Sequence, residues 1–426
     1  MQFKIETFQN PYLACDSNRV DAIISVASHR SAKRISRRTL VEGIIVDTSG
    51  SMYGERIQAV QGALQKVITA LDPESYFFIL GFGGTVRKFM PLSKATQSMK
   101  LLAINSTRNI EVRGDTVMSS AFAKAREQFE EMPDCIHHAM FLTDGQNNLN
   151  DESQLDAELI KCDGIFQCDC RGVGTDWQPK QLQKIARRLL GTATIIPHAT
   201  GIAADFYETV RNAMEREVSN VRLRLWMPKT SRLISVKQMS PEILSLTERG
   251  KPVDTQTSDF PTGAWGNESR DYHLAISVPP GESGDEMLAG KVSLVYEEGT
   301  VEVVSPPGRI IAAWTEDESL SARINAQVAH FTGQSELAEA IQKGLEMREK
   351  GYFDVATKLL GKAAKIAADS GNEETTRRLA KVVDIIDAHE GTVRLKKFVA
   401  KADEMDLDLG STRTARKNRA SATEIE

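Results

Sequence analysis

A short loop after one strongly apolar run carries three oxygen-bearing side chains. The run VEGIIVD ends at Asp47, and Ser49 and Ser51 follow at alternating positions in DTSGSM. A tight loop can turn side chains with this spacing toward one point. Carboxylate and hydroxyl oxygens are ligands of hard cations such as Mg²⁺, whereas soft metals favour Cys or His, and the loop has neither. The loop therefore predicts an oxygen-ligated metal site.

Two later loops carry matching oxygen groups. Asp115 and Thr116 precede a predicted helix, and Asp144 ends the apolar run HAMFLTD. In an open parallel sheet, the loops at the carboxyl ends of the strands lie along one edge, where ligands bind. We therefore expect the three loops to meet, with two carboxylates nearest the ion that roughly neutralise a divalent charge. The predicted metal ligands are Asp47, Ser49, Ser51, Thr116 and Asp144.

Residues 39–216 contain the elements that would position these loops. Short apolar runs alternate with amphipathic stretches, as in residues 56–71, where apolar side chains recur at helical spacing. Two strand-like runs flank Gly83 and Gly84, a pair that suits a hairpin turn and predicts an antiparallel edge strand. The alternation predicts an α/β fold, with a doubly wound, mostly parallel sheet covered by helices on both faces.

The flanking regions have different periodicities. Residues 217–316 alternate apolar and polar side chains between proline-containing turns, which predicts an all-β sandwich. Residues 1–38 also look strand-like and are too short to fold alone, so we expect them to complete this sandwich around an inserted α/β domain. Residues 317–405 have helical spacing with glycines between the candidate helices, which predicts an all-α bundle. Residues 406–426 lack apolar periodicity and are expected to form a disordered tail.

The composition argues against several classes of protein. With 41% hydrophobic and 26% charged residues the chain resembles ordinary globular proteins, and its net charge of -5 indicates no affinity for nucleic acid or anionic membranes. No segment has the roughly 20 apolar residues of a transmembrane helix. The N-terminus MQFKIETFQN lacks the features of a signal peptide, and five cysteines cannot all pair within the chain. We therefore expect a cytoplasmic protein.

The three loops resemble those of the von Willebrand factor type A (vWA) family. DTSGS at residues 47–51 resembles its DxSxS motif, Thr116 matches its threonine loop, and Asp144 in TDG matches its third loop. RGVGTD at residues 171–176 resembles the strand that follows its fourth helix. The resemblance covers about residues 40–216. It implies a metal-ion-dependent adhesion site, in which the carboxylate of a partner's Asp or Glu completes the metal shell.

The resemblance also implies roles for individual residues and for the ion. Asp144 is expected to reach the ion through water, and Asp115 to contact the ligands rather than the ion. Mg²⁺ is the expected ion, although Mn²⁺ accepts the same oxygen ligands. The implied function is a non-enzymatic, metal-dependent interaction module or scaffold that binds a protein rather than nucleic acid or membrane.

The order of the regions resembles intracellular bacterial multidomain vWA proteins. These are often linked to kinase, phosphatase, phosphothreonine-binding or ATPase partners in signalling or stress systems. Hydroxyl groups beside basic residues in the predicted tail would suit phosphorylation and docking of a kinase or a phosphothreonine-binding protein. The candidate phosphorylation sites are Thr412, Thr414, Ser421 and Thr423.

Several alternatives stay open from the sequence alone. The same metal site could serve a hydrolase, although no His lies in the three loops to act as a base. The site could be vestigial in a scaffold that binds through its helical end, and DxSxS alone could be a helix cap or turn. Cys162, Cys168 and Cys170 lie close together, but their spacing is not that of a zinc site, and we favour buried free thiols.

Overall fold

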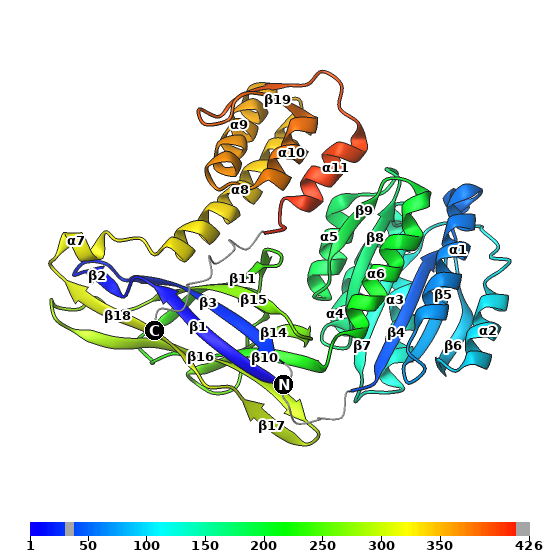
Figure 1. Ribbon diagram of the computed structural model, residues 1–426, viewed down its shortest axis with the longest axis horizontal. Coiled ribbons are helices and arrows are strands. Elements are labelled where there is room, and N and C mark those ends of the chain that lie inside the picture. The colour runs from blue at the N-terminus through cyan, green and yellow to red at the C-terminus, as the bar shows by residue number, and fades with distance from the viewer. Residues whose placement is uncertain (30–37, 415–426) are drawn as a thin grey trace, which may run out of the picture.

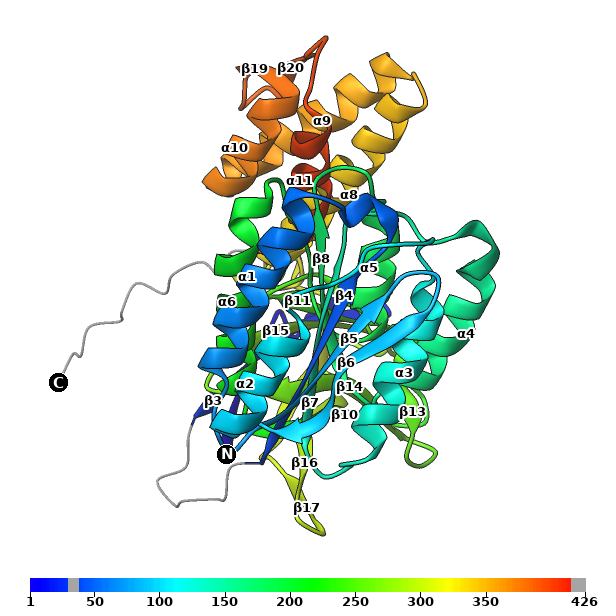
Figure 2. The same cartoon turned by 90° about the vertical axis from the view of Figure 1, so that its right-hand side faces the viewer.

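The computed structural model describes residues 1–29 and 38–414 (Figure 1). The chain forms an α/β region, a two-sheet β region and a C-terminal region that is mainly helical. The multidomain fold class predicted from the sequence is confirmed at this level. Figures 1 and 2 show the helical region next to both other regions.

A six-stranded sheet forms the centre of the α/β region, with the order β6-β5-β4-β7-β8-β9. Its strands are β4 (Leu40–Asp47), β5 (Tyr76–Phe82), β6 (Val86–Lys94), β7 (Ile136–Thr143), β8 (Gln167–Val173) and β9 (Ala193–Ile196). All neighbours are parallel except β5 and β6, whose antiparallel hairpin places β6 at the edge, as predicted. The chain order reverses between β4 and β7, and such switch points are where ligands bind.

Helices cover both faces of this sheet (Figure 2). One face packs against α1 (Glu55–Ala70), α2 (Gln97–Ser106) and α6 (Ile202–Met214). The other packs against α3 (Met118–Glu130), α4 (Glu152–Cys162) and α5 (Pro179–Arg188). Side chains alternate between the faces along a strand, so Ile44 and Val46 contact the first layer while Ile45 contacts the second.

Two antiparallel-rich sheets pack face to face in the β region. The first has the order β1-β3-β15-β11-β12, and the second has the order β13-β14-β10-β16-β18-β2, with β17 paired to β16. The strands are β1 (Gln2–Gln9), β2 (Tyr12–Ala14), β3 (Arg19–His29), β10 (Val218–Trp226), β11 (Arg232–Ser240), β12 (Leu244–Ser245), β13 (Lys251–Pro252), β14 (Thr257–Trp265), β15 (Ser269–Ser277), β16 (Glu286–Glu298), β17 (Val301–Val304) and β18 (Gly308–Thr315). Buried side chains of both sheets form one hydrophobic core.

The first strands of the chain belong to this sandwich. β3 pairs with β15 from Arg19 to Ala27, and β2 pairs with β18. The strands before and after the α/β region therefore share both sheets, and the α/β region occupies a position between them in the chain.

The C-terminal region is not entirely helical, so the all-α prediction was wrong in this detail. Its helices are α7 (Glu318–Ser321), α8 (Ala326–Glu349), α9 (Phe353–Asp369), α10 (Glu373–Val382) and α11 (Lys401–Gly410). A hairpin of β19 (Val383–Asp387) and β20 (Thr392–Leu395) separates the last two. β-Branched residues such as Val383 and Ile385 favour a strand. The hairpin turn lies against α9, since a Cβ added to Gly361 would lie 2.2 Å from the carbonyl oxygen of Gly391.

The predicted disordered tail does not begin at residue 406. Helix α11 continues to Gly410, and residues 411–414 run along the sandwich, where Ile243 N donates to Thr412 O at 2.8 Å. The apolar side chains Leu407 and Leu409 are buried and hold this segment. The rest of the predicted tail, residues 415–426, lies outside the described residues. None of the described helices has the length and apolar character needed to cross a bilayer.

Candidate metal centre

The loop after β4 fixes the carboxylate of Asp47 in a defined orientation. The side chain is fully buried, Oδ1 accepts a hydrogen bond from Ser49 N at 2.8 Å, and Oδ2 accepts one from Thr143 Oγ1 at 2.5 Å. Thr143 is the last residue of β7, the neighbouring strand. The register of the two strands thus sets the position of the carboxylate. A short 3₁₀ turn, Gly50–Met52, then carries Ser51.

The oxygen atoms of the three predicted loops converge. Ser49 Oγ lies 3.0 Å from Ser51 Oγ, and Ser51 Oγ donates to Asp144 Oδ1 at 2.6 Å. Thr116 belongs to the same cluster, because a Cβ added to Gly145 would lie 3.3 Å from Thr116 Oγ1 and 3.5 Å from Ser51 Oγ. The structure therefore brings together the five residues that the sequence singled out, which we call the oxygen cluster: Asp47, Ser49, Ser51, Thr116 and Asp144.

The cluster fits the ligand requirements of a hard divalent cation. All of its side-chain donor atoms are oxygens, and two of its members are carboxylates. Neighbouring ligands around an octahedral Mg²⁺ at about 2.1 Å lie about 3 Å apart. The separation of 3.0 Å between the Ser49 and Ser51 hydroxyls matches that spacing. No group of three or more His, Cys, Asp or Glu residues arranged for a metal occurs in residues 1–29 and 38–414, so the hydroxyls are needed to complete a ligand set.

Arg56 is a further part of the site, and the sequence did not single it out. Its Nη1 donates to Asp144 Oδ2, and its Nη2 donates to Asp176 Oδ2 at 3.0 Å. Arg56 lies in the first turn of α1, directly after the loop that carries Ser51. The guanidinium partly balances the negative charge of the oxygen cluster and holds the carboxylate oxygen of Asp144 that Ser51 does not contact.

Asp115, which we expected to contact the metal ligands, has a hydrogen-bond partner in the third loop. Its Oδ2 accepts a hydrogen bond from Asn148 Nδ2 at 3.1 Å, and Asn148 N donates to Thr116 O at 2.8 Å. Asp115 therefore acts through Asn148 on the backbone of the threonine loop. The neighbouring Asn147 accepts from Met118 N at 2.9 Å and so caps α3 just after that loop.

Burial has a strong effect on Asp47. It raises the pKa of this carboxyl to about 6, while the hydrogen bonds from Ser49 and Thr143 act in the opposite direction and the charge of Asp144 adds to the rise. Two carboxylates held this close repel one another, and a cation between them would relieve that repulsion.

Comparisons with known proteins agree with this geometry. A family model described as von Willebrand factor type A domain matches residues 43–195, and one described as von Willebrand factor type A C-terminal domain matches residues 365–411. The solved structure of a von Willebrand factor type A protein from Catenulispora acidiphila is 38% identical, with a TM-score of 0.93 over 98% of this chain and 97% of that chain. The chain belongs to the von Willebrand factor type A family.

More distant similarities are found with other proteins, and that with the ArnB paralog is a similarity of fold. The ArnB paralog VWA2 from Sulfolobus acidocaldarius is 14% identical, with a TM-score of 0.62 over 97% of this chain and 98% of that chain. Mouse inter alpha-trypsin inhibitor heavy chain 4 is 28% identical over 189 residues, 41% of this chain. An uncharacterized Synechocystis protein is 21% identical over 274 residues, 62% of this chain. The chain spans 20% of the mouse relative and 64% of the Synechocystis relative.

The vWA family match extends to the end of the helical region. The C-terminal domain model covers α11 up to residue 411, which agrees with the packing of α11 against the rest of the chain. Proteins with vWA domains typically mediate protein–protein interactions.

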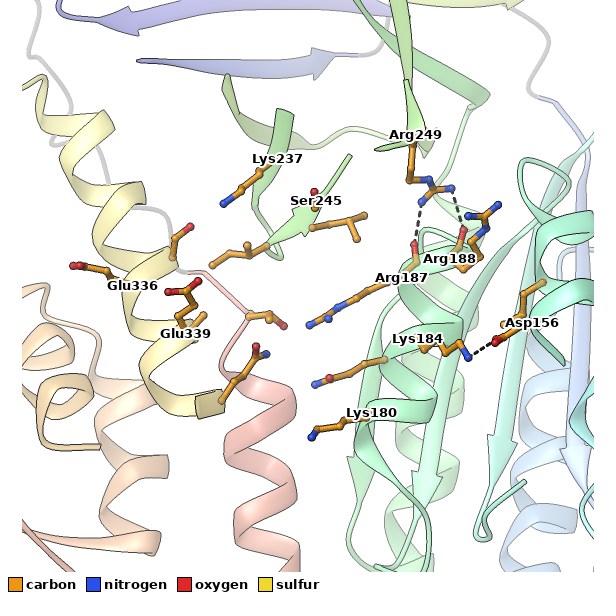
Figure 3. A pocket seen from close by; sticks show the side chains of 18 of the residues that line it. Asp156, Lys180, Lys184, Arg187, Arg188, Lys237, Ser245, Arg249, Glu336 and Glu339 are labelled. Carbon is orange, nitrogen blue, oxygen red and sulfur yellow. Dashed lines mark hydrogen bonds and ion pairs between the residues drawn. The ribbon is translucent and has the colours of Figure 1, made fainter. Parts of the chain in front are cut away.

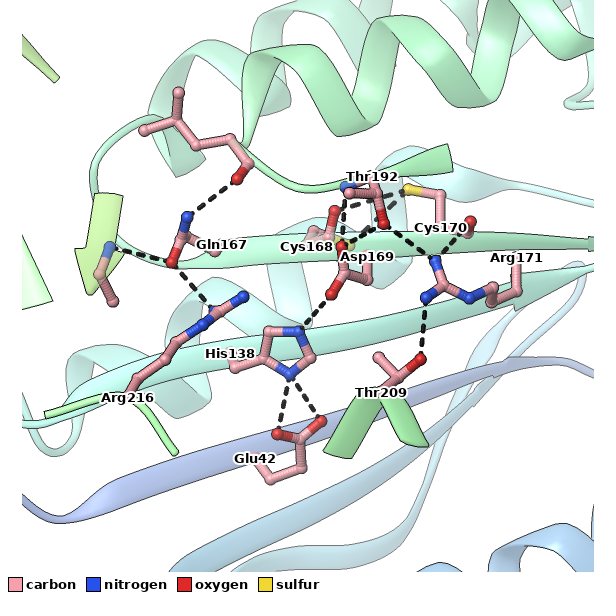
Figure 4. Close-up of polar contacts among 12 residues, drawn as sticks. Glu42, His138, Gln167, Cys168, Asp169, Cys170, Arg171, Thr192, Thr209 and Arg216 are labelled. Atoms are coloured by element: carbon pink, nitrogen blue, oxygen red, sulfur yellow. Dashed lines mark hydrogen bonds and ion pairs between the residues drawn. The ribbon is translucent and has the colours of Figure 1, made fainter. Parts of the chain in front are cut away.

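The vWA sheet also contains a buried polar network away from the oxygen cluster (Figure 4). His138 Nδ1 lies 2.8 Å from Glu42 Oε2, and its Nε2 lies 3.0 Å from Asp169 Oδ2. Arg171, two residues further along β8, bonds Asp205 at 2.6 Å and Thr209 at 2.8 Å on α6. The network joins three central strands to α6, and the residues named here are not members of the oxygen cluster.

The cysteine cluster of the vWA domain does not form a metal site within the described residues. Cys162, Cys168 and Cys170 are fully buried. The sulfur atoms of Cys168 and Cys170 lie 3.9 Å apart, and Cys162 Sγ donates to the carbonyl oxygen of Phe122 at 3.7 Å. Burial raises the pKa of Cys162 to about 12, so this thiol stays protonated and unreactive at neutral pH.

Two of the candidate phosphorylation sites are held against the sandwich, one of them buried and the other partly buried. The Thr412 side chain is buried and donates to Glu242 Oε1 at 2.8 Å. The Thr414 hydroxyl donates to the carbonyl oxygen of Met239. A kinase would have to detach Thr412 from the sandwich to reach its hydroxyl. The expected disordered tail around these two residues was wrong, and their phosphorylation stays a prediction. Ser421 and Thr423 lie outside the described residues.

Proposed function

We propose that this vWA protein is a non-enzymatic interaction protein whose oxygen cluster holds Mg²⁺, and that a partner's Asp or Glu completes the metal shell. The observation that supports this best is the meeting of carboxylates and hydroxyls from three separate loops at the switch point of the sheet. Mn²⁺ would fit the same oxygens. A bound cation would supply a positive centre that attracts a partner's carboxylate.

The surface around the oxygen cluster also suits a protein partner. Tyr53 and Leu149 are 82% and 87% exposed, and they lie in the loops next to Ser51 and Asn148. Large apolar side chains around a charged centre are common in protein interfaces, where they contribute contact area while the charged contact gives specificity. These two side chains would surround the bound carboxylate of the partner.

Affinity capture from a cell extract tests this proposal. The wild type and Asp47→Ala would be used as baits in Mg²⁺ and in EDTA, with recovered proteins identified by mass spectrometry. We expect one or more proteins to bind only the wild type and only in Mg²⁺. Asp47→Ala removes a ligand and relieves the repulsion with Asp144, so the fold should be retained, which thermal unfolding would check.

The matched control is Asp134→Ala, which removes an exposed carboxylate outside the three loops. It should capture the same proteins as the wild type. Equal recovery in Mg²⁺ and EDTA would contradict the proposal.

We further propose that Ser421 and Thr423 are the hydroxyls of the C-terminal segment that a cytoplasmic kinase would modify, in a bacterial signalling or stress system. The support for this is their position beside Arg416, Lys417 and Arg419 and the burial of Thr412. Phosphopeptide mapping of the protein isolated from its own cells tests it. Phosphate at Ser421 or Thr423 is expected, and phosphate at Thr412 alone would contradict it.

A further inference from the structure

A large cavity lies where the three regions of the chain meet (Figure 3). Its volume is about 970 Å³. It is lined by α5 of the vWA domain, by β11, β12 and the turn after them in the sandwich, and by α8 of the helical region. None of the oxygen cluster residues lines it. The cavity is therefore separate from the candidate metal centre.

Three cations of this cavity have no ion-pair partner among residues 1–29 and 38–414. Lys180 and Arg187 are exposed on α5, and Lys237 projects from β11 on the opposite wall. Within the part of the chain that the structure describes, none of these three side chains forms an ion pair or a side-chain hydrogen bond. Lys180 and Arg187 act electrostatically on Asp408, but burial dominates there and raises the pKa of that carboxyl.

The other charged side chains of the cavity have partners. Lys184 pairs with Asp156, and Arg188 and Arg249 both pair with Asp163, at 3.1 Å and 2.5 Å. The two acids on α8 are also engaged: Glu336 pairs with Lys362 at 3.3 Å and Glu339 with Lys343 at 3.6 Å. The cavity thus presents a surplus of positive charge, whereas the whole chain is negative.

The cations form a row rather than a convergent cluster. The two free cations of α5, Lys180 and Arg187, lie about 10.5 Å apart along the helix axis, with the ion-paired Lys184 between them. Side chains on one face of an extended peptide repeat about every 6.6 Å. A row of this kind matches carboxylates at alternate positions of an extended chain, whereas a single phosphate would need several cations directed at one point.

The opposite wall offers backbone and apolar contacts for such a chain. β12 is the outer strand of its sheet, and both of its residues, Leu244 and Ser245, line the cavity. The C-terminal segment pairs with Pro241, Glu242 and Ile243, all before β12 begins. An exposed strand edge can bind an extended peptide through backbone hydrogen bonds. Ile243 supplies apolar surface next to this edge, and the exposed Ile160 on α4 supplies it from the vWA wall.

We propose that this cavity binds an extended acidic segment of a partner protein, with its carboxylates on Lys180, Arg187 and Lys237 and its backbone along β12. Occupation of the cavity would connect the vWA domain, the sandwich and the helical region through one ligand. The proposal is independent of the metal centre, since no residue is shared between the two sites.

Fluorescence anisotropy with the full chain tests the proposal. The probe is a labelled peptide of about ten residues with alternating Glu and Thr, roughly 33 Å long when extended. Binding is measured in EDTA, so that a metal-bound carboxylate cannot contribute, and a peptide with Gln in place of Glu is the neutral comparison. We expect the acidic peptide to bind the wild type and Asp47→Ala equally, and the neutral peptide to bind at least about tenfold more weakly.

The double variant Lys180→Glu/Arg187→Glu is expected to bind the acidic peptide at least about tenfold more weakly, because it turns two attractive contacts into repulsive ones. Lys66→Glu/Lys358→Glu makes the same change in net charge at exposed positions on α1 and α9 and should leave binding unchanged. Lys237→Gln gives a second, smaller loss from the opposite wall. Circular dichroism would confirm that each variant is folded.

Four results would overturn the proposal. Equal loss in both double variants would mean that net charge alone attracts the peptide. Binding that disappears in EDTA would place the peptide at the metal centre. Displacement of the peptide by inorganic phosphate at micromolar concentration, or binding of phosphatidylglycerol vesicles that only the cavity variant loses, would assign the cavity to a phosphate group or a lipid surface.

Discussion

At the oxygen cluster, every carboxylate oxygen of Asp47 and Asp144 has a donor supplied by the protein. Ser49 N and Thr143 hold Asp47, and Ser51 and Arg56 hold Asp144. A carboxylate oxygen accepts two hydrogen bonds or ligands, so each atom keeps a lone pair for a cation. These hydrogen-bond donors orient the carboxylates before a metal binds, which lowers the free-energy cost of assembling the site around the metal.

Arg56 competes electrostatically with a cation at this site. Arg56→Gln removes a positive charge that contacts Asp144 and also releases Asp176. We expect this variant to bind Mg²⁺ at least about tenfold more tightly, since a unit charge a few ångströms from a divalent cation is worth on the order of 1–2 kcal/mol even with the screening of bulk water. Isothermal titration calorimetry would measure the affinity.

Arg126→Gln provides the control for this titration. Arg126 pairs with Glu130 and Glu158 on the helices behind the site, and its removal should leave the affinity for Mg²⁺ unchanged. An unchanged or weaker affinity in Arg56→Gln would contradict the role assigned to Arg56.

The residues of the oxygen cluster could be predicted from the sequence, because each lies just before or after an element with a strong apolar pattern. Asp47 and Asp144 end apolar runs, and two carboxylates at the ends of neighbouring parallel strands must lie close together. The role of Arg56 could not be predicted, because in the sequence it looks like any basic residue in the first turn of a helix. Its contact with Asp144 depends on how α1 is oriented over the sheet, and local spacing does not encode that orientation.

At the scale of elements, β4, β7 and β8 are joined by charged groups as well as by backbone hydrogen bonds (Figure 4). Burial alone would lower the pKa of His138, but the charge of Glu42 and the hydrogen bond to Asp169 raise it. Burial also raises the pKa of Glu42. Burial acts on Asp169 in the same direction, but the hydrogen bond with His138 and the charge of Arg171 hold the pKa of Asp169 well below its usual range.

These shifts predict how stability depends on pH. The folded protein keeps a proton on His138 at pH values where the unfolded chain, with a histidine pKa of 6.5, releases it. The contribution of His138 is therefore fully present below pH 6.5 and is lost as pH rises through its folded pKa. The raised pKa of Glu42 acts in the same direction, and Asp169 affects stability only at acid pH. We expect the free energy of unfolding to fall above pH 6.5, measured by urea titration.

Variants separate this effect from other titrations. Glu42→Gln/His138→Gln removes both groups and should flatten the pH profile above neutrality. His198→Gln, which changes an exposed histidine, should leave the profile as in the wild type. A wild-type profile that rises with pH in this range would contradict the assignment of a proton to the network.

Most elements of the α/β region were predictable, because each apolar run or amphipathic stretch is long and regular. Helix α2 was missed because its apolar side chains do not form one face: Leu101 and Leu102 are 53% and 55% exposed, while Ala103 is buried. The β19–β20 hairpin was missed for a different reason. The apolar positions around Val383 fit a helical and a strand spacing equally well, and contact with α9 decides between the two.

At the scale of the molecule, α11 and residues 411–414 connect the helical region to the sandwich. Thr412 lies buried against Glu242, whose pKa is raised by burial. The tail prediction failed here because the few apolar residues after Met405 show no clear helical period. Tertiary packing buries them instead: Leu407 packs in the core of the helical region and Leu409 in the core of the vWA domain.

A negative charge at Thr412 should therefore destabilise this junction. Thr412→Glu replaces a hydrogen bond to Glu242 with a repulsion between two buried acids, and we expect a loss of about 1–3 kcal/mol in unfolding free energy. Chemical denaturation and hydrogen exchange of α11 would measure the loss. Ser98→Glu adds the same charge at an exposed position in the first turn of α2 and should cost nothing. Unchanged protection of α11 in Thr412→Glu would refute this role of Thr412.

The most direct test of the metal centre is a crystal structure of the protein grown in Mn²⁺, with an anomalous difference map. We expect one strong peak in contact with the hydroxyl oxygens of Ser49 and Ser51, which is absent in crystals of Asp47→Ala. Crystals of the wild type that show no peak there at millimolar Mn²⁺, or a peak only at other residues, would contradict a metal site at the oxygen cluster.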